Sequence, residues 1–230
     1  MAGNRIQDHH AEQELSKYLD KYFYPTILKY YKKVYSDFEV IGERVTNKDE
    51  QLDGIDYRYV INDRKKIINI NIDEKSQLYY MDKNLQTFAF EINSLQRGFI
   101  YPGWLFDYSL KTNTYMIVYP KSSVSISNIN YMDFHDVESY LIKRNDLLDY
   151  LNQRGFTSSF CENVASDIRN NHINFTNDNG NRYKYLLEDS NHMTITDIYF
   201  TYSYNLLEHP INLVINKQNL INMSFFRIKK

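Results

Sequence analysis

Residues 67–77 read IININIDEKSQ, and this short stretch decides how the chain is expected to fold. Isoleucine stands at 68, 70 and 72, and polar or charged residues stand at 69, 71, 73, 75 and 77. Alternation with a period of two predicts a β-strand with one apolar and one polar face. A strand with such a polar face either exposes it to solvent or lines a cleft with it.

A second strand is predicted over residues 55–61, which read IDYRYVI and also alternate. Residues 62–66 between the two strands, NDRKK, are typical of a turn. Pairing of the two strands brings Asp56 close to Asp73 and Lys75.

Two carboxylates and a lysine on adjoining strands can hydrolyse a phosphodiester when they hold a divalent metal ion. Such an ion makes a water molecule nucleophilic and neutralises the charge that grows on the phosphoryl oxygens. Asp56 and Asp73 would supply two oxygen ligands and the main-chain carbonyl of Glu74 a third. Mg²⁺, for which Mn²⁺ substitutes, is the expected ion because it prefers oxygen ligands. Lys75 shares a face with Asp73, so it would help to deprotonate the metal-bound water or pair with the scissile phosphate.

These residues resemble the PD-(D/E)xK nuclease superfamily, which has the restriction-endonuclease-like fold. Asp56 matches the first acid, with Ile55 in place of the family's proline, and Asp73 and Lys75 match the (D/E)xK tripeptide. Gln77 matches a glutamine that recombination and exonuclease branches place two residues after the lysine. The resemblance implies a metal-dependent deoxyribonuclease, an endonuclease in the first instance, in which these four matching positions are catalytic.

The resemblance covers about residues 10–120 and implies further features. An acid on the first helix often completes the site in these enzymes; Glu14 and Glu12 both qualify, and Glu14 is preferred as a metal ligand. The string from Gln51 to Trp104 also resembles a branch of nuclease-like proteins carried by phages and bacteria. Many enzymes of this fold dimerise, so a homodimer that acts on DNA is expected by analogy.

Other interpretations of the same residues stay open. The two strands could form a hairpin with a solvated polar face, on which Asp73 and Lys75 would be a weak surface pair. Arg58 could bind a substrate phosphate or serve as a salt-bridge partner, and Asp53 and Glu91 are weaker candidates for the metal site. The chain could also be a catalytically silent module that binds DNA or protein, which the net charge of −2 favours.

The remaining patterns predict an α/β architecture. Residues 9–35 carry an apolar stripe at helical spacing that Pro25 interrupts, so a split or kinked helix is expected. This helix would pack on a sheet of about five strands formed by residues 55–61, 67–77, 87–92, 104–106 and 115–119, the last ended by Pro120. Further along, we expect helices at 137–151, 158–170 (with Thr157 as N-cap) and 217–222, a turn at 177–180, and strands near 183–188, 193–203, 211–216 and 223–228.

Length and composition indicate the size of the core, the domain organisation and the cellular environment. The 230 residues are 43% hydrophobic, so a large core can be buried. We expect a mixed central sheet flanked by helices, of the restriction-endonuclease-like type, over residues 1–130 and an α+β extension over 131–230, separate or part of the same globule. The single Cys161 excludes an internal disulfide and suits a reducing cytoplasm. No run approaches the ~18 apolar residues of a membrane span, so a soluble cytoplasmic protein is predicted.

Overall fold

The computed structural model describes residues 5–170, 182–183, 198–203 and 206–230, and the predicted turn at 177–180 lies outside them. The chain divides into two compact units. The first, called the β3 unit, comprises Asn4–Asn84, Ser109–Leu147 and Met223–Lys230. The second, called the β4 unit, comprises Met1–Gly3, Leu85–Tyr108 and Leu148–Asn222. The predicted boundary near residue 130 therefore falls within the β3 unit.

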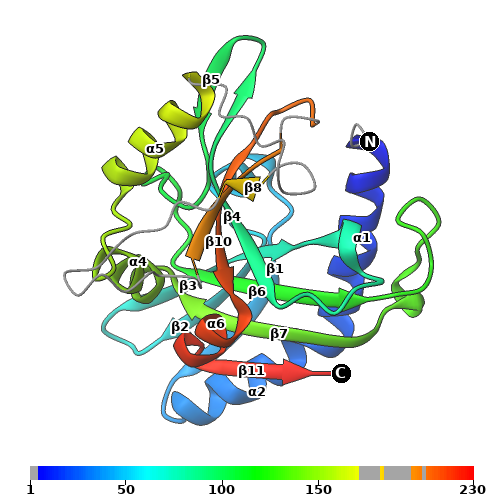
Figure 1. Cartoon of the computed structure of the whole chain (residues 1–230). Helices are drawn as coiled ribbons and strands as arrows, with labels where there is room; N and C mark the ends of the chain where they lie inside the picture. The colour runs from blue at the N-terminus through cyan, green and yellow to red at the C-terminus, as the bar shows by residue number, and fades with distance from the viewer. Residues whose placement is uncertain (1–4, 171–181, 184–197, 204–205) are drawn as a thin grey trace. The chain divides into compact units, whose positions relative to one another are not determined.

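The β3 unit is built on a mixed sheet (Figure 1). In order across the sheet, its strands are β1 (Glu39–Arg44), β2 (Tyr57–Asn62), β3 (Ile67–Ser76), β6 (Thr114–Lys121), β7 (His135–Lys143) and β11 (Phe226–Lys229). β3 and β6 run parallel, and the other neighbouring strands are antiparallel. A mixed α/β architecture is therefore confirmed, and β3 lies inside the sheet with a hydrogen-bonded strand on each side.

Two helices pack on one face of this sheet. α1 (Arg5–Tyr22) and α2 (Tyr24–Val34) are separated at Phe23, and Pro25 lies in the first turn of α2, where its missing N–H leaves no helical hydrogen bond unmade. The predicted break at Pro25 is confirmed. A single buried cluster joins the helices to β2 and β3 and includes Leu15, Leu19, Ile27, Tyr59, Ile61 and Ile72.

The predicted turn between β2 and β3 is confirmed. The side chains of Asn62 and Asp63 accept hydrogen bonds from the backbone N–H groups that follow them, and Arg64 adopts a left-handed conformation with φ 65°. Such contacts close a tight turn and thereby fix the register of the flanking strands. A short helix, α3 (Lys48–Leu52), leads into β2, and a 3-10 helix, η1 (Leu78–Tyr80), follows β3.

The β4 unit contains a second sheet, which is antiparallel. Its strands, in order, are β5 (Phe99–Pro102), β4 (Thr87–Gln96), β10 (Ile211–Asn216), β9 (Ile198–Tyr202) and β8 (Arg182–Tyr183). The predicted helices are present as α5 (Ser158–Asn170) and α6 (Lys217–Met223). The hydroxyl of Thr157 accepts the N–H of Phe160 at 3.2 Å, which confirms the predicted N-cap.

The prediction of one central sheet that includes residues 87–92 and 104–106 is wrong. β4 pairs with β5 and β10 rather than with β3. Residues 104–106 form a turn that lies against β4, since the N–H of Gly103 donates to the carbonyl of Ile92 at 2.7 Å. A Cβ atom at Gly103 would come within 2.3 Å of the carbonyl oxygen of Glu91, so only glycine allows this close approach.

The prediction of a helix over residues 137–151 is also wrong in its first half, because β7 occupies this segment before α4 (Arg144–Asn152) begins. β7 is buried on both faces, so its apolar and polar residues do not alternate. The sequence of such a strand cannot be distinguished from that of a buried helix by periodicity. β6 does not end at Pro120, as predicted, but continues to Lys121. Its pairing with β7 is irregular at this point, so the missing N–H of Pro120 breaks no hydrogen bond of the sheet. Among the described residues, we find no helix whose length and hydropathy would let it cross a membrane.

Candidate functional site

The register of β2 and β3 brings the two predicted metal-binding aspartates together. Tyr57 pairs with Ile72, and the N–H of Asp56 donates to the carbonyl of Ile72 at 2.8 Å. The next position along each strand therefore sets Asp56 beside Asp73. Oδ2 of Asp56 accepts the N–H of Glu74 at 2.8 Å, which fixes the orientation of this carboxylate.

Asp73 and Lys75 form a largely buried ion pair. Nζ of Lys75 lies 2.7 Å from Oδ1 of Asp73. The Asp73 residue is only 2% exposed, and the Lys75 side chain is 25% exposed. The alternative of a weak surface pair on a solvated hairpin is therefore wrong. Oδ2 of Asp73 is buried and has no hydrogen-bond partner within the described residues, although a buried polar atom without a partner costs free energy.

The same burial changes the charges at the pair. Burial raises the pKa of Asp73 to about 7; Lys75 opposes this shift and the negative charge of Asp56 adds to it. Burial alone would lower the pKa of Lys75, yet the attraction of Asp73 outweighs it and the pKa is raised. Lys75 is therefore a cation at neutral pH, while Asp73 holds a proton during part of the time.

The donor set at the pair fits a hard divalent cation. Asp56 and Asp73 converge, and the unpartnered Oδ2 of Asp73 is an oxygen that a cation would satisfy. The described part of the chain contains no cluster of three or more His, Cys, Asp or Glu side chains suited to a metal ion. Two carboxylates with water in the remaining positions suit Mg²⁺, which keeps several waters when bound. The carbonyl of Glu74 as a third ligand stays a prediction.

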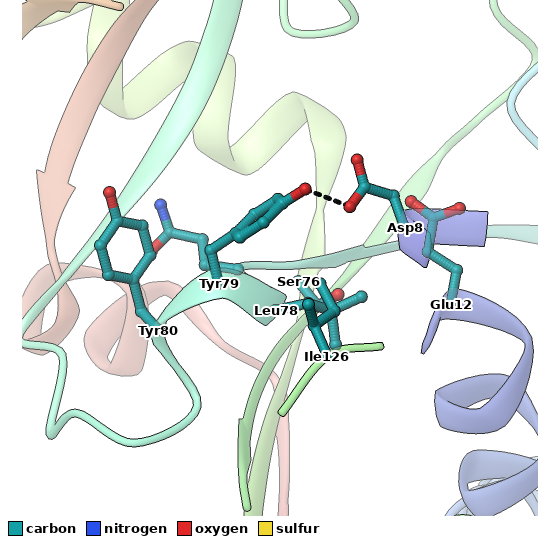
Figure 2. Close-up of a pocket in the computed structure, with 8 residues that line it drawn as sticks. Asp8, Glu12, Ser76, Leu78, Tyr79, Tyr80 and Ile126 are labelled. Carbon is teal, nitrogen blue, oxygen red and sulfur yellow. Dashed lines mark hydrogen bonds between the residues drawn. The ribbon is translucent and has the colours of Figure 1, made fainter. Parts of the chain in front are cut away.

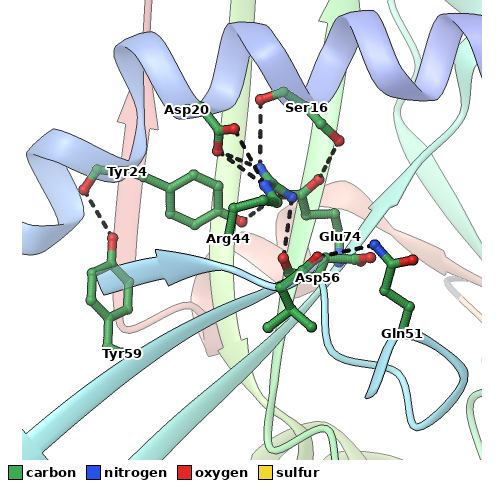
Figure 3. Close-up of polar contacts among 9 residues, drawn as sticks. Ser16, Asp20, Tyr24, Arg44, Gln51, Asp56, Tyr59 and Glu74 are labelled. Carbon is green, nitrogen blue, oxygen red and sulfur yellow. Dashed lines mark hydrogen bonds and ion pairs between the residues drawn. The ribbon is translucent and has the colours of Figure 1, made fainter. Parts of the chain in front are cut away.

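The opposite face of β3 carries a fully partnered carboxylate, that of Glu74 (Figure 3). Oε1 of Glu74 lies 2.7 Å from Nη1 of Arg44 and accepts the hydroxyl of Tyr24, and Oε2 accepts the hydroxyl of Ser16 at 3.0 Å. Burial raises the pKa of Tyr24 well above its ordinary value, so this hydroxyl remains a donor. Arg44 is held in turn by Asp20 at 2.6 Å.

Arg44 links this network to the candidate site. Its guanidinium donates to the main-chain carbonyl of Asp56 at 3.4 Å. It lies 5.2 Å from the ring centroid of Tyr24 and 5.4 Å from that of Tyr57, and these two rings stack at 3.6 Å. Neither Arg44 nor the side chain of Glu74 was among the predicted site residues. The sequence does contain a sign of this network, because Glu74 lies on the same strand face as the isoleucines. An acid on a buried face requires a cation from a neighbouring element.

The structure does not direct Glu14 toward the aspartates. Its Oε1 contacts Nζ of Lys17 at 2.5 Å, and its Oε2 accepts the N–H of Tyr131, in the 3-10 helix η2 (Tyr131–Asp133), at 2.9 Å. The hydrogen bond from Lys17 lowers the pKa of Glu14. Glu12, the other acid considered on α1, interacts electrostatically with Lys75 and Asp56, although loss of hydration is the main reason that its pKa is raised.

The remaining predicted residues lie in different surroundings. Arg58 forms salt bridges with Glu50 at 2.5 Å and with Glu43 at 3.6 Å, in line with the salt-bridge interpretation. Asp53 pairs with Lys111 at 2.8 Å. Glu91 belongs to β4, in the other unit.

A cavity opens just beyond β3 (Figure 2). Gln77 is one of the residues that line it. The cavity has a volume of about 250 Å³, and we call it the η1 cavity. Its walls also include Glu12 of α1 and the two tyrosines of η1, Tyr79 and Tyr80. Gln77, two residues after Lys75, and Glu12, which interacts electrostatically with Lys75, therefore line the same cavity.

No protein-family model, no curated protein and no solved structure matches this chain.

We predict that Asp73 makes the metal-free protein less stable as the pH rises. Its folded pKa of about 7 lies above the ordinary value of 3.8, so its stabilising contribution is complete below pH ~4 and is lost as the pH rises through ~7. Relative to Asp73→Asn, the wild type should lose up to about 1.4 kcal/mol per pH unit in this window. Urea unfolding in EDTA at several pH values measures this, and parallel curves for the two proteins would contradict it. Lys75 stays charged over this pH range. In Asp73→Asn, the loss of its partner therefore changes the free energy of unfolding by the same amount at each pH and adds no slope against pH.

We predict that Arg44 matters more for stability than Arg58. Arg44→Met leaves Glu74, whose side chain is 10% exposed, buried without its cation, and should lower the free energy of unfolding by about 3 kcal/mol. Arg58→Met leaves Glu50, which is 39% exposed and can be hydrated, and should cost about 1 kcal/mol or less. Adding Glu74→Gln to Arg44→Met should recover part of the loss. Equal losses for the two arginine variants in chemical denaturation would refute the burial argument.

Proposed function

We propose that this protein hydrolyses phosphodiester bonds of DNA with the help of Mg²⁺, in the first instance as an endonuclease. The observation that carries the proposal is the buried Oδ2 of Asp73, which has no hydrogen-bond partner in the described structure and lies beside Asp56 and Lys75. An acid that only stabilised the fold would have both oxygens partnered, as Glu74 has.

The residues at the pair divide the work of the proposed reaction. Asp56 and Asp73 would hold the metal ion, which when bound activates a water molecule and neutralises phosphoryl charge. Lys75 carries a positive charge in the metal-free site, since its pKa is raised, and this favours pairing with the scissile phosphate over proton abstraction. Gln77 and Glu12 lie at the neighbouring cavity, where they would contact the nucleotide next to the cleaved bond.

We further propose that the β3 unit has the restriction-endonuclease-like fold. This rests on a helix followed by three antiparallel strands, with the first acid immediately before β2 and the Asp-Glu-Lys tripeptide at the end of β3. The parallel neighbour β6 then completes a mixed sheet. The rival proposal, a module that binds DNA or protein without turnover, needs neither the convergence of Asp56 and Asp73 nor a lysine at 2.7 Å from one of them.

We predict metal-dependent nicking of supercoiled plasmid or cleavage of single-stranded DNA. Asp73→Asn and Lys75→Ala should each reduce the rate at least about 100-fold, because each removes a charge that acts at the reacting phosphate. Glu138→Gln and Lys229→Ala are matched controls, since these residues form another ion pair of the β3 unit, at 3.1 Å, and should cut at the wild-type rate. Equal cutting by the Asp73 and Lys75 variants would contradict this site, and no cutting by the wild type would favour the binding module.

We predict that Mg²⁺ stabilises the wild type and not Asp73→Asn. Binding at one site raises the melting temperature by roughly 5 °C at pH 8 and saturating Mg²⁺. The rise should be smaller at pH 6, because the pKa of Asp73 is about 7 and a proton then competes with the metal. Differential scanning fluorimetry measures both effects, with Glu138→Gln as the control. The same rise in Asp73→Asn would place the metal elsewhere.

A further inference from the structure

The η1 cavity adjoins the candidate active site and has walls of unusual chemistry (Figure 2). Asp8 and Glu12 come from α1, and Gln77, Tyr79 and Tyr80 come from the segment that follows β3. Ser76 and Gln77 directly follow Lys75 in the chain and line the cavity, which ties the cavity to the proposed phosphate position. Its volume of about 250 Å³ equals that of roughly eight water molecules, the size class of a single nucleobase.

The polar groups of the cavity select for hydrogen-bond donors. The carboxylate oxygens of Asp8 and Glu12 accept hydrogen bonds, and negative charge on them would repel phosphate, so the sugar–phosphate backbone is a poor occupant. Tyr79 already donates its hydroxyl to Asp8, which leaves the other lone pairs of this carboxylate to a ligand. A nucleobase amino group is a donor that carboxylates recognise.

The tyrosines supply aromatic surface for a base. Tyr79 is 53% exposed and Tyr80 is 45% exposed, so both rings are accessible to a ligand in the cavity. Bases stack on such rings, and the stacking tolerates any base. Nζ of Lys83 lies 5.2 Å from the ring centroid of Tyr80 and provides positive charge for the phosphate of the same nucleotide.

We propose that the η1 cavity binds one unpaired nucleobase that carries an exocyclic amino group (cytosine, adenine or guanine), next to the scissile phosphate. Thymine is disfavoured because two carbonyls flank its single N–H and face the carboxylates. A base inside a duplex is stacked and paired, so single-stranded or locally opened DNA reaches the cavity at the lowest cost. This inference rests on the proposed nuclease function and names its substrate class.

The test compares the binding of fluorescein-labelled dC10 and dT10 to the full chain by fluorescence anisotropy at pH 7.5. Ca²⁺ replaces Mg²⁺ because it also binds oxygen ligands, and gel analysis confirms that the probes remain intact. The wild type should bind dC10 at least about fivefold more tightly than dT10.

Variants separate base recognition from stacking. Glu12→Gln should bring the affinity ratio close to one, because a carboxamide also donates to the carbonyls of thymine. Tyr80→Ala should weaken both probes about tenfold and keep their ratio. Tyr101→Ala is the matched control, since Tyr101 is 48% exposed and does not line the cavity, and it should change neither value.

Equal affinity of the wild type for dC10 and dT10, or a preference that survives Glu12→Gln, would overturn the base site. Metal-dependent nicking together with equal affinities would remove the base site and keep the nuclease. A preference that Glu12→Gln abolishes, without cleavage of any DNA, would keep the base site and remove the nuclease.

Discussion

Three consecutive charged residues, Asp73, Glu74 and Lys75, lie in a strand that has a paired strand on each side. Because neighbouring side chains of a strand point to opposite faces, each face must compensate its own buried charge. Glu74 is satisfied by a cation and two hydroxyl donors. Asp73 is paired with Lys75 and interacts with the side chain of Asp56, which is itself an acid, and Oδ2 of Asp73 is without a hydrogen-bond partner of ordinary geometry in the described structure. This difference between the two acids supports our proposal that Asp73 binds a ligand.

The contacts of Glu74 on one face of β3 also hold Asp56 in position at the other face. Arg44 binds the side chain of Glu74 and the main-chain carbonyl of Asp56, and the N–H of Glu74 binds the side chain of Asp56. The carboxylate of Asp56 therefore cannot turn away from Asp73 without breaking contacts that reach α1 and α2. A metal site needs ligands whose positions are fixed before the metal binds, and buried networks of this kind provide that rigidity.

The sequence predicted the parts of the fold that depend on local patterns. Alternation in residues 67–77, a polar turn and an interrupted helical stripe were enough to predict β3, its hairpin with β2, and the split between α1 and α2. Pairing partners were not predictable in this way, because β4 has the same local pattern whether it joins β3 or β10. β7 was hidden by its double burial. Arg44 was missed because its role depends on contacts between elements far apart in the sequence, which periodicity does not encode.

The charges near Asp73 and Lys75 determine the order in which the metal ion and DNA would bind in the proposed reaction. Without metal, acidic side chains gather near the pair, and the charge of Lys75 is already engaged by Asp73 at 2.7 Å. A polyanion meets repulsion at such a place, and the net charge of −2 offers no general attraction to overcome it. In the proposed reaction, Asp56 and Asp73 would hold the divalent ion, which would favour the ionised form of Asp73 and offset the local negative charge, and Lys75 would then be able to pair with a phosphate. Under the proposed function, metal binding would therefore precede DNA binding, and the acidity that argues against a nucleic-acid protein would make the affinity for DNA depend on the metal.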